Sequence, residues 1–314
     1  MRRIITALLV ATLGVPGHAQ EWPERTVKIV VPYAAGGPSD SMARITAQRL
    51  SETFRQPFLI ENRPGANGAI AGEAVARSPA DGYTLYWATP GQITILPAVS
   101  KLSYDPVRDL VPITIVAVNR FVLIVNRKSI PVTTVAEFVQ HVRANPGKLA
   151  YADAGSGSVT HLAMELFLKR QGLRMISVSY KGLAPALTDV VAGHVPAMFA
   201  SLGDAVQHSG VALLAVSSDT RAPQVPDVPT IIESGVPGFN VVSWNGLMAP
   251  AGTPKSVVDR IAAEVARATR ERAFAERLNS QGFATAANTP EEFAAVIASE
   301  IPMWAEAVRS AGLN

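Results

Sequence analysis

The first part of the chain changes from a strand-like to a helix-like spacing of apolar residues. Residues 27–31 form a β-branched run that is typical of a strand covered on both faces, and a loop follows it. Ala43, Ala47, Leu50 and Phe54 then recur at i, i+4, i+7 and i+11, on one face of a helix. The two patterns together predict a strand-loop-helix unit.

The same alternation continues along the rest of the chain. Helices are expected to end near residue 76, to begin near residue 135 behind a capping box of Thr134 and Glu137, to follow residue 158, and to cover 184–192 and 203–208. Further strands are expected at residues 58–61, 84–88, 113–118, 121–125, 149–152, 176–179, 195–200, 212–216 and 240–244. Because strands and helices alternate, the sequence predicts an α/β protein with a mostly parallel sheet in each of two lobes.

The last third of the chain contains two helix starts. Thr253 and Pro254 give an N-cap with proline at the first helical position, which predicts a long helix to about Leu278. Thr289 with Glu292 forms a capping box for a terminal helix. We expect both helices to pack on the first lobe.

The chain is expected to cross between the lobes twice, near residue 118 and near residue 223. The second crossing lies at the start of a proline-rich stretch that ends near residue 237. This division gives one lobe from residues 20–117 and 224–314 and a second lobe from residues 118–223, each of ordinary domain size.

The N-terminus has the features of an export signal. Arg2 and Arg3 precede an apolar stretch that is too short to cross a membrane, and small residues follow at Gly17 and Ala19. We expect cleavage after residue 19 and a soluble mature protein in the periplasm. A retained amphipathic anchor is the weaker alternative, because the arginines lie at one end of the segment and not along one helical face.

Composition excludes several classes of function. The chain has no cysteine, which rules out disulfides and thiolate chemistry. Its formal charge is +3, of which the signal contributes two, so that the mature form has about +1 and no basic stripe for nucleic acid. The five histidines have no metal-ligand spacing, and we expect no metal and no cofactor.

The loop after the first strand is the first candidate binding site. Gly36 and Gly37 let the backbone approach a ligand closely, and the helix behind them offers unpaired N–H groups to a carboxylate or phosphate. The loop lacks the lysine and the spacing of a nucleotide P-loop. Taken alone, it is equally well explained as a turn capped by Ser39 or Asp40.

Two further loops follow strands of the second lobe. Residues 155–161 join glycines to Ser158, Thr160 and His161 at a helix start, a pattern that also fits an ordinary N-cap. Tyr180, with Lys181 beside it, directly follows another strand; a solvated lysine is the simpler interpretation there. Because ligands gather at the carboxyl ends of strands in α/β sheets, facing lobes would place these loops on one cleft.

Enzyme signatures are weak. Ser156 and Ser158 do not form the G-x-S-x-G nucleophile elbow, and no G-x-G-x-x-G follows the first strand. The aspartates at 40, 153, 189 and 204 could supply an acid-base pair only if folding brought two of them together. We therefore expect a binding protein and not an enzyme.

The motifs taken together resemble the Bug family of periplasmic solute-binding proteins, the TctC-like receptors of tripartite tricarboxylate transporters. They run in family order over nearly the whole expected mature chain. The matching segments are residues 30–33, 35–40, 43–44, 61–68, 81–85, 145–149, 155–158, 180–182 and 249–254.

The resemblance implies a two-lobed Venus-flytrap fold of type II that closes on a small carboxylate and delivers it to integral-membrane permease subunits. It also implies that backbone N–H groups and waters hold the carboxylate, with Asp204 at the distal end of the ligand. We expect a monomer. A ligand-binding accessory of a signalling system and an α/β hydrolase are the alternatives. The expected ligand-binding residues are Tyr33, Ala35, Gly36, Gly37, Ser39, Asp40, Gly155, Ser156, Ser158, Thr160, His161, Tyr180, Lys181 and Asp204.

Overall fold

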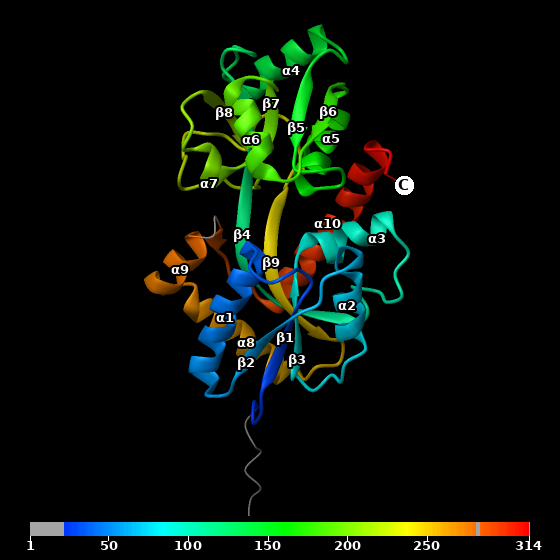
Figure 1. The fold of residues 1–314 in the computed structure, drawn as a ribbon, viewed down its shortest axis with the longest axis vertical. Coiled ribbons are helices and arrows are strands. Elements are labelled where there is room, and N and C mark those ends of the chain that lie inside the picture. The colour runs from blue at the N-terminus through cyan, green and yellow to red at the C-terminus, as the bar shows by residue number, and fades with distance from the viewer. Residues whose placement is uncertain (1–21, 281–282, 314) are drawn as a thin grey trace, which may run out of the picture.

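The computed structural model describes residues 22–280 and 283–313, so the expected export signal lies outside the described residues. The chain folds into two α/β lobes stacked along the long axis of the molecule (Figure 1). Within the described ranges, no helix combines the length and the apolar character needed to cross a membrane.

The first lobe is built around three parallel strands in the order β2-β1-β3, and β9 and β4 extend the sheet with antiparallel pairs. Its strands are β1 (Val27–Val31), β2 (Phe58–Asn62), β3 (Thr84–Ala88), the first part of β4 (Leu110–Asn126), β9 (Val242–Pro250) and β10 (Ala284–Thr285). Its helices are α1 (Pro38–Phe54), η1 (Ala66–Gly68), α2 (Ala69–Ala76), the π-helical turn η2 (Gly91–Ile95), α3 (Leu96–Val99), α8 (Lys255–Ala268) and α9 (Arg272–Asn279).

The second lobe repeats this plan around the parallel strands β6-β5-β7, with β4 antiparallel to both β7 and β8. Its strands are the second part of β4, β5 (Ala150–Asp153), β6 (Ile176–Ser179), β7 (Ala197–Ser201) and β8 (Val211–Val216). Its helices are α4 (Val135–Ala144), α5 (Val159–Gln171), α6 (Leu183–Ala192) and α7 (Leu202–Ala205). The expected fold class is therefore confirmed, with sheets that are mixed because the crossing strands run antiparallel.

The side chains of β4 alternate between two apolar clusters in the second lobe, as expected for a strand covered on both faces. Leu123 and Val125 pack with α4 and α5, whereas Val122 and Ile124 pack with α6 and α7. The sequence predicted two separate strands on either side of Asn119. The structure instead has one continuous strand that changes sheet partners there, from β9 to β7 and β8.

The capping boxes at Thr134 and Thr289 are confirmed, but the predicted helix from 254 to 278 is not one helix. Its apolar stripe is interrupted by Glu271 and Arg272, so the chain turns before α9 buries Phe274. At its start, the Thr253 hydroxyl donates to the Pro250 carbonyl and does not cap the helix. Pro254 occupies the N-cap position, whereas the sequence predicted it at the first helical position.

The C-terminal part of the chain packs differently from the expectation. Ile231, Val236 and Phe239 belong to the apolar cluster of the second lobe, which favours a return crossing at the start of β9 and not near residue 223. The terminal helix α10 (Pro290–Ser310) buries Phe293 in the first lobe and Trp304 in the second. Figure 1 shows α10 rising from one lobe to the other beside β4 and β9. Three segments therefore join the lobes.

The close contact between β9 and α10 generates a stability prediction. A Cβ on Gly246 would lie 2.8 Å from the Phe293 ring and 3.0 Å from the Thr114 carbonyl oxygen. Gly246→Ala should therefore lower the free energy of unfolding by about 1–3 kcal/mol, as overpacking of a core does. Chemical denaturation measures the loss. Gly203→Ala is the control, because a Cβ there meets no atom within 4 Å and should change the stability little; equal stability of the two variants would contradict this packing.

Candidate functional site

A cleft of about 1490 Å³ opens between the two lobes, beside the crossing strands. The first lobe contributes residues 32–34, 37–39, 64–68 and 89–92, and the second lobe contributes residues 154–159 with Ser201 and Asp204. Asn119 of β4 and Asn245 of β9 also line it. The two glycine-rich loops predicted from the sequence therefore face one cavity.

Asp40 organises the first loop from behind. Its buried carboxylate accepts hydrogen bonds from the Gly36 N–H at 2.9 Å, from the Arg44 guanidinium at 2.9 and 3.1 Å, and from the Asn62 amide at 2.8 Å. Burial by itself would raise the pKa of Asp40, but these hydrogen bonds outweigh it, so the pKa lies below its ordinary value. Asp40 thus holds the loop shape and is not among the residues that line the cleft.

Three side chains of the first lobe form a closed hydrogen-bonded ring at the cleft. The Thr89 hydroxyl donates to Gln92 Oε1 at 2.6 Å, and Gln92 Nε2 donates to the Tyr33 hydroxyl at 3.0 Å. The Tyr33 hydroxyl lies 2.9 Å from Thr89 Oγ1, and it is the donor there because the Thr89 hydrogen is already used. The ring consumes the hydroxyl hydrogens, so Tyr33 and Thr89 present acceptors to the cleft.

A second group fixes the start of α1. The Ser39 hydroxyl donates to Asn245 Oδ1 at 2.8 Å, and the buried Trp87 indole N–H lies 3.0 Å from both oxygens. Ser39 therefore ties the first helical turn to the crossing strand β9. The backbone N–H groups of this turn have no intrahelical acceptor, and they lie at the positive end of the helix dipole.

The loop of the second lobe is also held by its own polar side chains. Ser158 caps α5 by accepting from the His161 N–H, and His161 Nδ1 accepts from the Gly157 N–H at 3.1 Å. Thr160 accepts from the Ala154 N–H. Thr160 and His161 are buried and lie outside the lining of the cleft, so they shape the loop from inside.

Gly155 adopts a φ of +124°, a conformation that side chains rarely allow. Its N–H donates at 2.8 Å to Asp153, a fully buried carboxylate that also accepts from Ser177 and Ser179. This network anchors the loop to the ends of β5 and β6. The resulting turn exposes Ser156 and Gly157 to the cleft.

The third predicted loop lies beside the cleft and not on it. The Tyr180 hydroxyl donates to Asp189 at 2.6 Å, and burial together with this carboxylate raises the pKa of Tyr180 to about 12. Lys181 is exposed. Neither residue lines the cleft in this conformation.

The structure thus sorts the predicted residues into two groups, while their role in binding stays a prediction. The cleft is lined by Tyr33, Gly37, Ser39, Gly155, Ser156, Ser158 and Asp204. The residues outside its lining are Ala35, Gly36, Asp40, Thr160, His161, Tyr180 and Lys181. Sequence reasoning missed the lining residues Asn67, Thr89, Gln92, Asn119, Ser201, Ser243 and Asn245. Thr89 directly follows the strand predicted at residues 84–88, and this position at the carboxyl end of a strand could have indicated that it lines the cleft.

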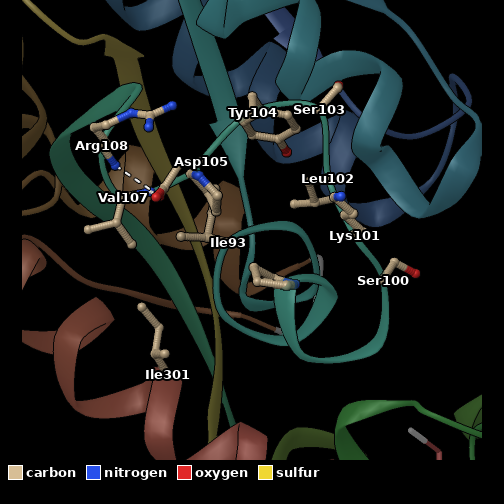
Figure 2. Close-up of a pocket in the computed structure, with 12 residues that line it drawn as sticks. Ile93, Ser100, Lys101, Leu102, Ser103, Tyr104, Asp105, Val107, Arg108 and Ile301 are labelled. Carbon is tan, nitrogen blue, oxygen red and sulfur yellow. Dashed lines mark hydrogen bonds between the residues drawn. The ribbon is translucent and has the colours of Figure 1, made fainter.

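A smaller cavity of about 580 Å³ lies elsewhere on the first lobe (Figure 2). It is formed by residues 100–108 with Ile93 of η2 and Ile301 of α10. The second lobe's β-sheet and glycine loops contribute no residue to its lining, so closure of the lobes would not enclose a ligand there. The interlobe cleft is the better candidate for the binding site.

In the part of the chain that the structure describes, no group of three or more histidine, aspartate or glutamate side chains is placed to hold a metal ion.

The comparisons with known proteins agree with this geometry. Residues 42–313 match the model of the TctC family, described as the tripartite tricarboxylate transporter family receptor. The chain belongs to the TctC family. It is thus a member of a family of periplasmic solute-binding receptors, which confirms the resemblance found in the sequence.

Two curated relatives cover nearly the full length of the chain. One is a protein of Pseudomonas sp. strain P51 from the tcbD-tcbE intergenic region, 36% identical over 100% of this chain and 95% of its own length. The other is BugT of Bordetella pertussis, 32% identical over 98% of this chain and 96% of its own.

Solved structures of TctC-like proteins share the fold. Rpa4515 of R. palustris with adipate is 36% identical, with a TM-score of 0.72 over 93% of this chain and 99% of its own. MatC of Rhodopseudomonas palustris with bound malate is 34% identical, with a TM-score of 0.69 over 91% of this chain and 100% of its own. A Polaromonas TctC protein without ligand is only 26% identical, yet its TM-score is 0.85 over 92% of this chain and 99% of its own. The chain therefore superposes better on the structure without ligand than on either complex.

The role of Asp40 generates a prediction about stability and pH. Its folded pKa is lowered, so its contribution is present above the unfolded value of 3.8 and is lost as the pH falls through the folded value. Asp40→Asn should lower the free energy of unfolding at neutral pH by about 1 kcal/mol, since Arg44 is half exposed and part of the attraction is screened. Denaturation at a series of pH values should show that the difference in free energy of unfolding between the wild type and Asp40→Asn shrinks as the pH falls. A difference that grew under acid conditions would contradict the role of the Asp40 carboxylate in holding the loop.

Proposed function

We propose that this protein captures a small carboxylate in the interlobe cleft and delivers it to a tripartite tricarboxylate-type transporter. The observation that carries the proposal is the makeup of the cleft. Asp204 is the single charged side chain in its described lining, and no lysine or arginine takes part. An anion would therefore be held by backbone N–H groups, as oxyanions are at helix N-termini.

The hydrogen-bond pattern of the loops supports this mode of binding. The side chains of Asp40, His161 and Thr160 are already engaged within their own loops. The N–H groups of Gly36, Gly155 and Gly157 donate to these and other buried side chains of the loops, so the loops form rigid frames on both sides of the cleft. Such preorganisation reduces the entropy that binding would otherwise cost.

The size of the cleft supports a closing motion. Its volume of about 1490 Å³ exceeds the range of roughly 300–1,000 Å³ typical of small-molecule pockets. We propose that the lobes swing toward one another about β4, β9 and α10, and so bring the Gly155 loop onto the ligand held by the first lobe. The better superposition on a ligand-free relative than on relatives with adipate or malate supports this direction of change.

We propose binding without chemistry. The Asp40 carboxylate accepts a hydrogen bond from the Gly36 N–H in the first loop. The Asp153 carboxylate accepts hydrogen bonds from Ser177 and Ser179, and the Asp189 carboxylate accepts one from Tyr180. These separate partners do not support an acid-base pair of the kind a hydrolase needs. A periplasmic location and delivery to membrane permease subunits complete the proposal, on the strength of the family.

Calorimetric titration of the mature protein with adipate, malate and other di- and tricarboxylates tests the proposal. We expect at least one dicarboxylate to bind with micromolar or tighter affinity. Gly155→Ala should weaken that binding at least about tenfold, because alanine does not tolerate the φ that exposes the loop. Gly147→Ala, at another glycine of positive φ outside the cleft, is the matched control. Absence of carboxylate binding would overturn the proposal.

Asp204 generates a prediction about selectivity. A carboxylate on the cleft wall repels a second negative charge on the ligand and attracts an ammonium or hydroxyl group. Asp204→Asn should therefore tighten the binding of a plain dicarboxylate and weaken that of an amino dicarboxylate, each by roughly three- to tenfold. The control is Asp227→Asn, which changes the same charge at an exposed site outside the cleft lining. Equal effects on both ligands would show that Asp204 does not read the ligand.

A further inference from the structure

A buried glutamate lies directly behind the wall of the cleft. Glu300 of α10 is only 4% exposed. Its Oε1 accepts a hydrogen bond from the Trp244 indole N–H at 2.9 Å, and its Oε2 lies 2.9 Å from the Thr94 hydroxyl. The Trp304 indole N–H points at the same carboxylate from 3.4 Å. The carboxyl group thus joins η2, β9 and α10.

These partners connect Glu300 to the cleft and to both lobes. Thr94 belongs to the same short turn as Gln92, which lines the cleft and takes part in the Tyr33 ring. Trp244 lies on β9 between two cleft-lining residues, Ser243 and Asn245. Trp304 packs in the second lobe. Ile93 and Ile301, the chain neighbours of Thr94 and Glu300, line the smaller cavity together (Figure 2).

The Thr94 hydroxyl has one hydrogen and two acceptors within reach. Besides Glu300 at 2.9 Å, it can donate to the Pro90 carbonyl oxygen at 3.1 Å. When Glu300 is ionised, Thr94 donates to the carboxylate and leaves Pro90. When Glu300 is protonated, its own hydrogen goes to Thr94 Oγ1, and Thr94 donates to Pro90. The protonation state of Glu300 thus decides whether Pro90, a residue of the cleft wall, is held through Thr94.

We propose that Glu300 is a positioning residue of the binding site, which sets the Pro90–Gln92 wall of the cleft through the Thr94 hydroxyl. This inference rests on the proposed function, because the wall it sets is the proposed ligand site. The protonated form gives the wall one more hydrogen bond and removes a buried negative charge from behind an anion site. Both effects favour carboxylate binding.

The surroundings of Glu300 allow this exchange of protons near neutral pH. Burial raises the pKa of Glu300 to about 7, although the hydrogen bonds from Thr94, Trp244 and Trp304 partly oppose the rise. Among the described ionisable groups, none adds a charge effect to it. The residues of η2 and β9 that pack against it are neutral. On α10 itself, Glu292 is engaged with Thr289 and Glu306 with Arg170. Carboxylate affinity should therefore fall as the pH rises through neutrality.

A first experiment needs no ligand. In protein labelled with nitrogen-15, the indole N–H signals of Trp244 and Trp304 should titrate with one shared midpoint near neutral pH. The signals of Trp22 and Trp87 should not, because Trp87 donates to Ser39 and Asn245. The Gln92 side-chain amide should follow the same midpoint if the wall responds. Glu300→Gln should abolish all three titrations, whereas Glu306→Gln on the same helix should preserve them.

A second experiment measures malate affinity by calorimetry from about pH 6 to about pH 8.5, a range in which ordinary carboxyls stay ionised. The wild type should weaken roughly fivefold, at the lower end of coupling between sites. Glu300→Gln should show a flat profile at the acid-side affinity, since its amide can donate to Thr94 permanently. Thr94→Val should reduce the pH dependence to the part that the buried charge of Glu300 contributes by itself, and Thr94→Ser should restore the full profile.

The outcomes separate this inference from the proposed function. The positioning role would be overturned by indole signals that do not titrate, by a Gln92 amide that does not follow them, or by a malate profile that is undiminished in Thr94→Val. Failure of every carboxylate to bind would overturn the proposed function instead, and the Gln92 titration would still decide whether Glu300 sets the wall.

Discussion

The pairing of β4 with β9 is the constraint on which the rest of the molecule depends. The two strands run antiparallel from Leu110 to Arg120 on β4, and β4 then continues without a break into the second sheet. One backbone ladder thus carries both lobes and places Asn119 and Asn245 beside the cleft. The ladder fixes which loops face each other, and it is one of the segments about which we propose that the lobes close.

The loops on either side of the cleft use one physical solution. In each, a buried acceptor holds a glycine N–H: Asp40 holds Gly36, and Asp153 holds Gly155. The charge needed to shape the loop therefore stays behind the backbone and out of the cleft. This division fits the proposed recognition of an anion through backbone dipoles, without a cation that would bind many anions equally well.

The sequence predicted the frame of this protein because the frame follows local rules. β1, β3 and β6 have the predicted bounds, and two capping boxes begin helices where Thr134 and Thr289 stand. The family motifs also located both loops. These features depend on residues within one turn or one strand of each other, so the sequence alone carries the information.

The remaining features depend on contacts between distant residues. The hydrogen-bonded residues Tyr33 and Thr89 are 56 positions apart in the sequence, and Thr94 and Glu300 are 206 positions apart. The family resemblance implied that Asp40, Thr160 and His161 face the ligand, but all three are buried and their side chains hold the loops from inside. Likewise, the capping box at Thr289 predicted a terminal helix without showing that the two halves of α10 enter different lobes.

The most direct test of the account is a crystal structure of the mature protein with its bound dicarboxylate. We predict lobes closed over the ligand, with one carboxylate accepting hydrogen bonds from backbone N–H groups at the start of α1 and from Ser156 in the loop of the second lobe. A ligand held by a lysine or arginine side chain, or bound outside the cleft, would contradict the central claim.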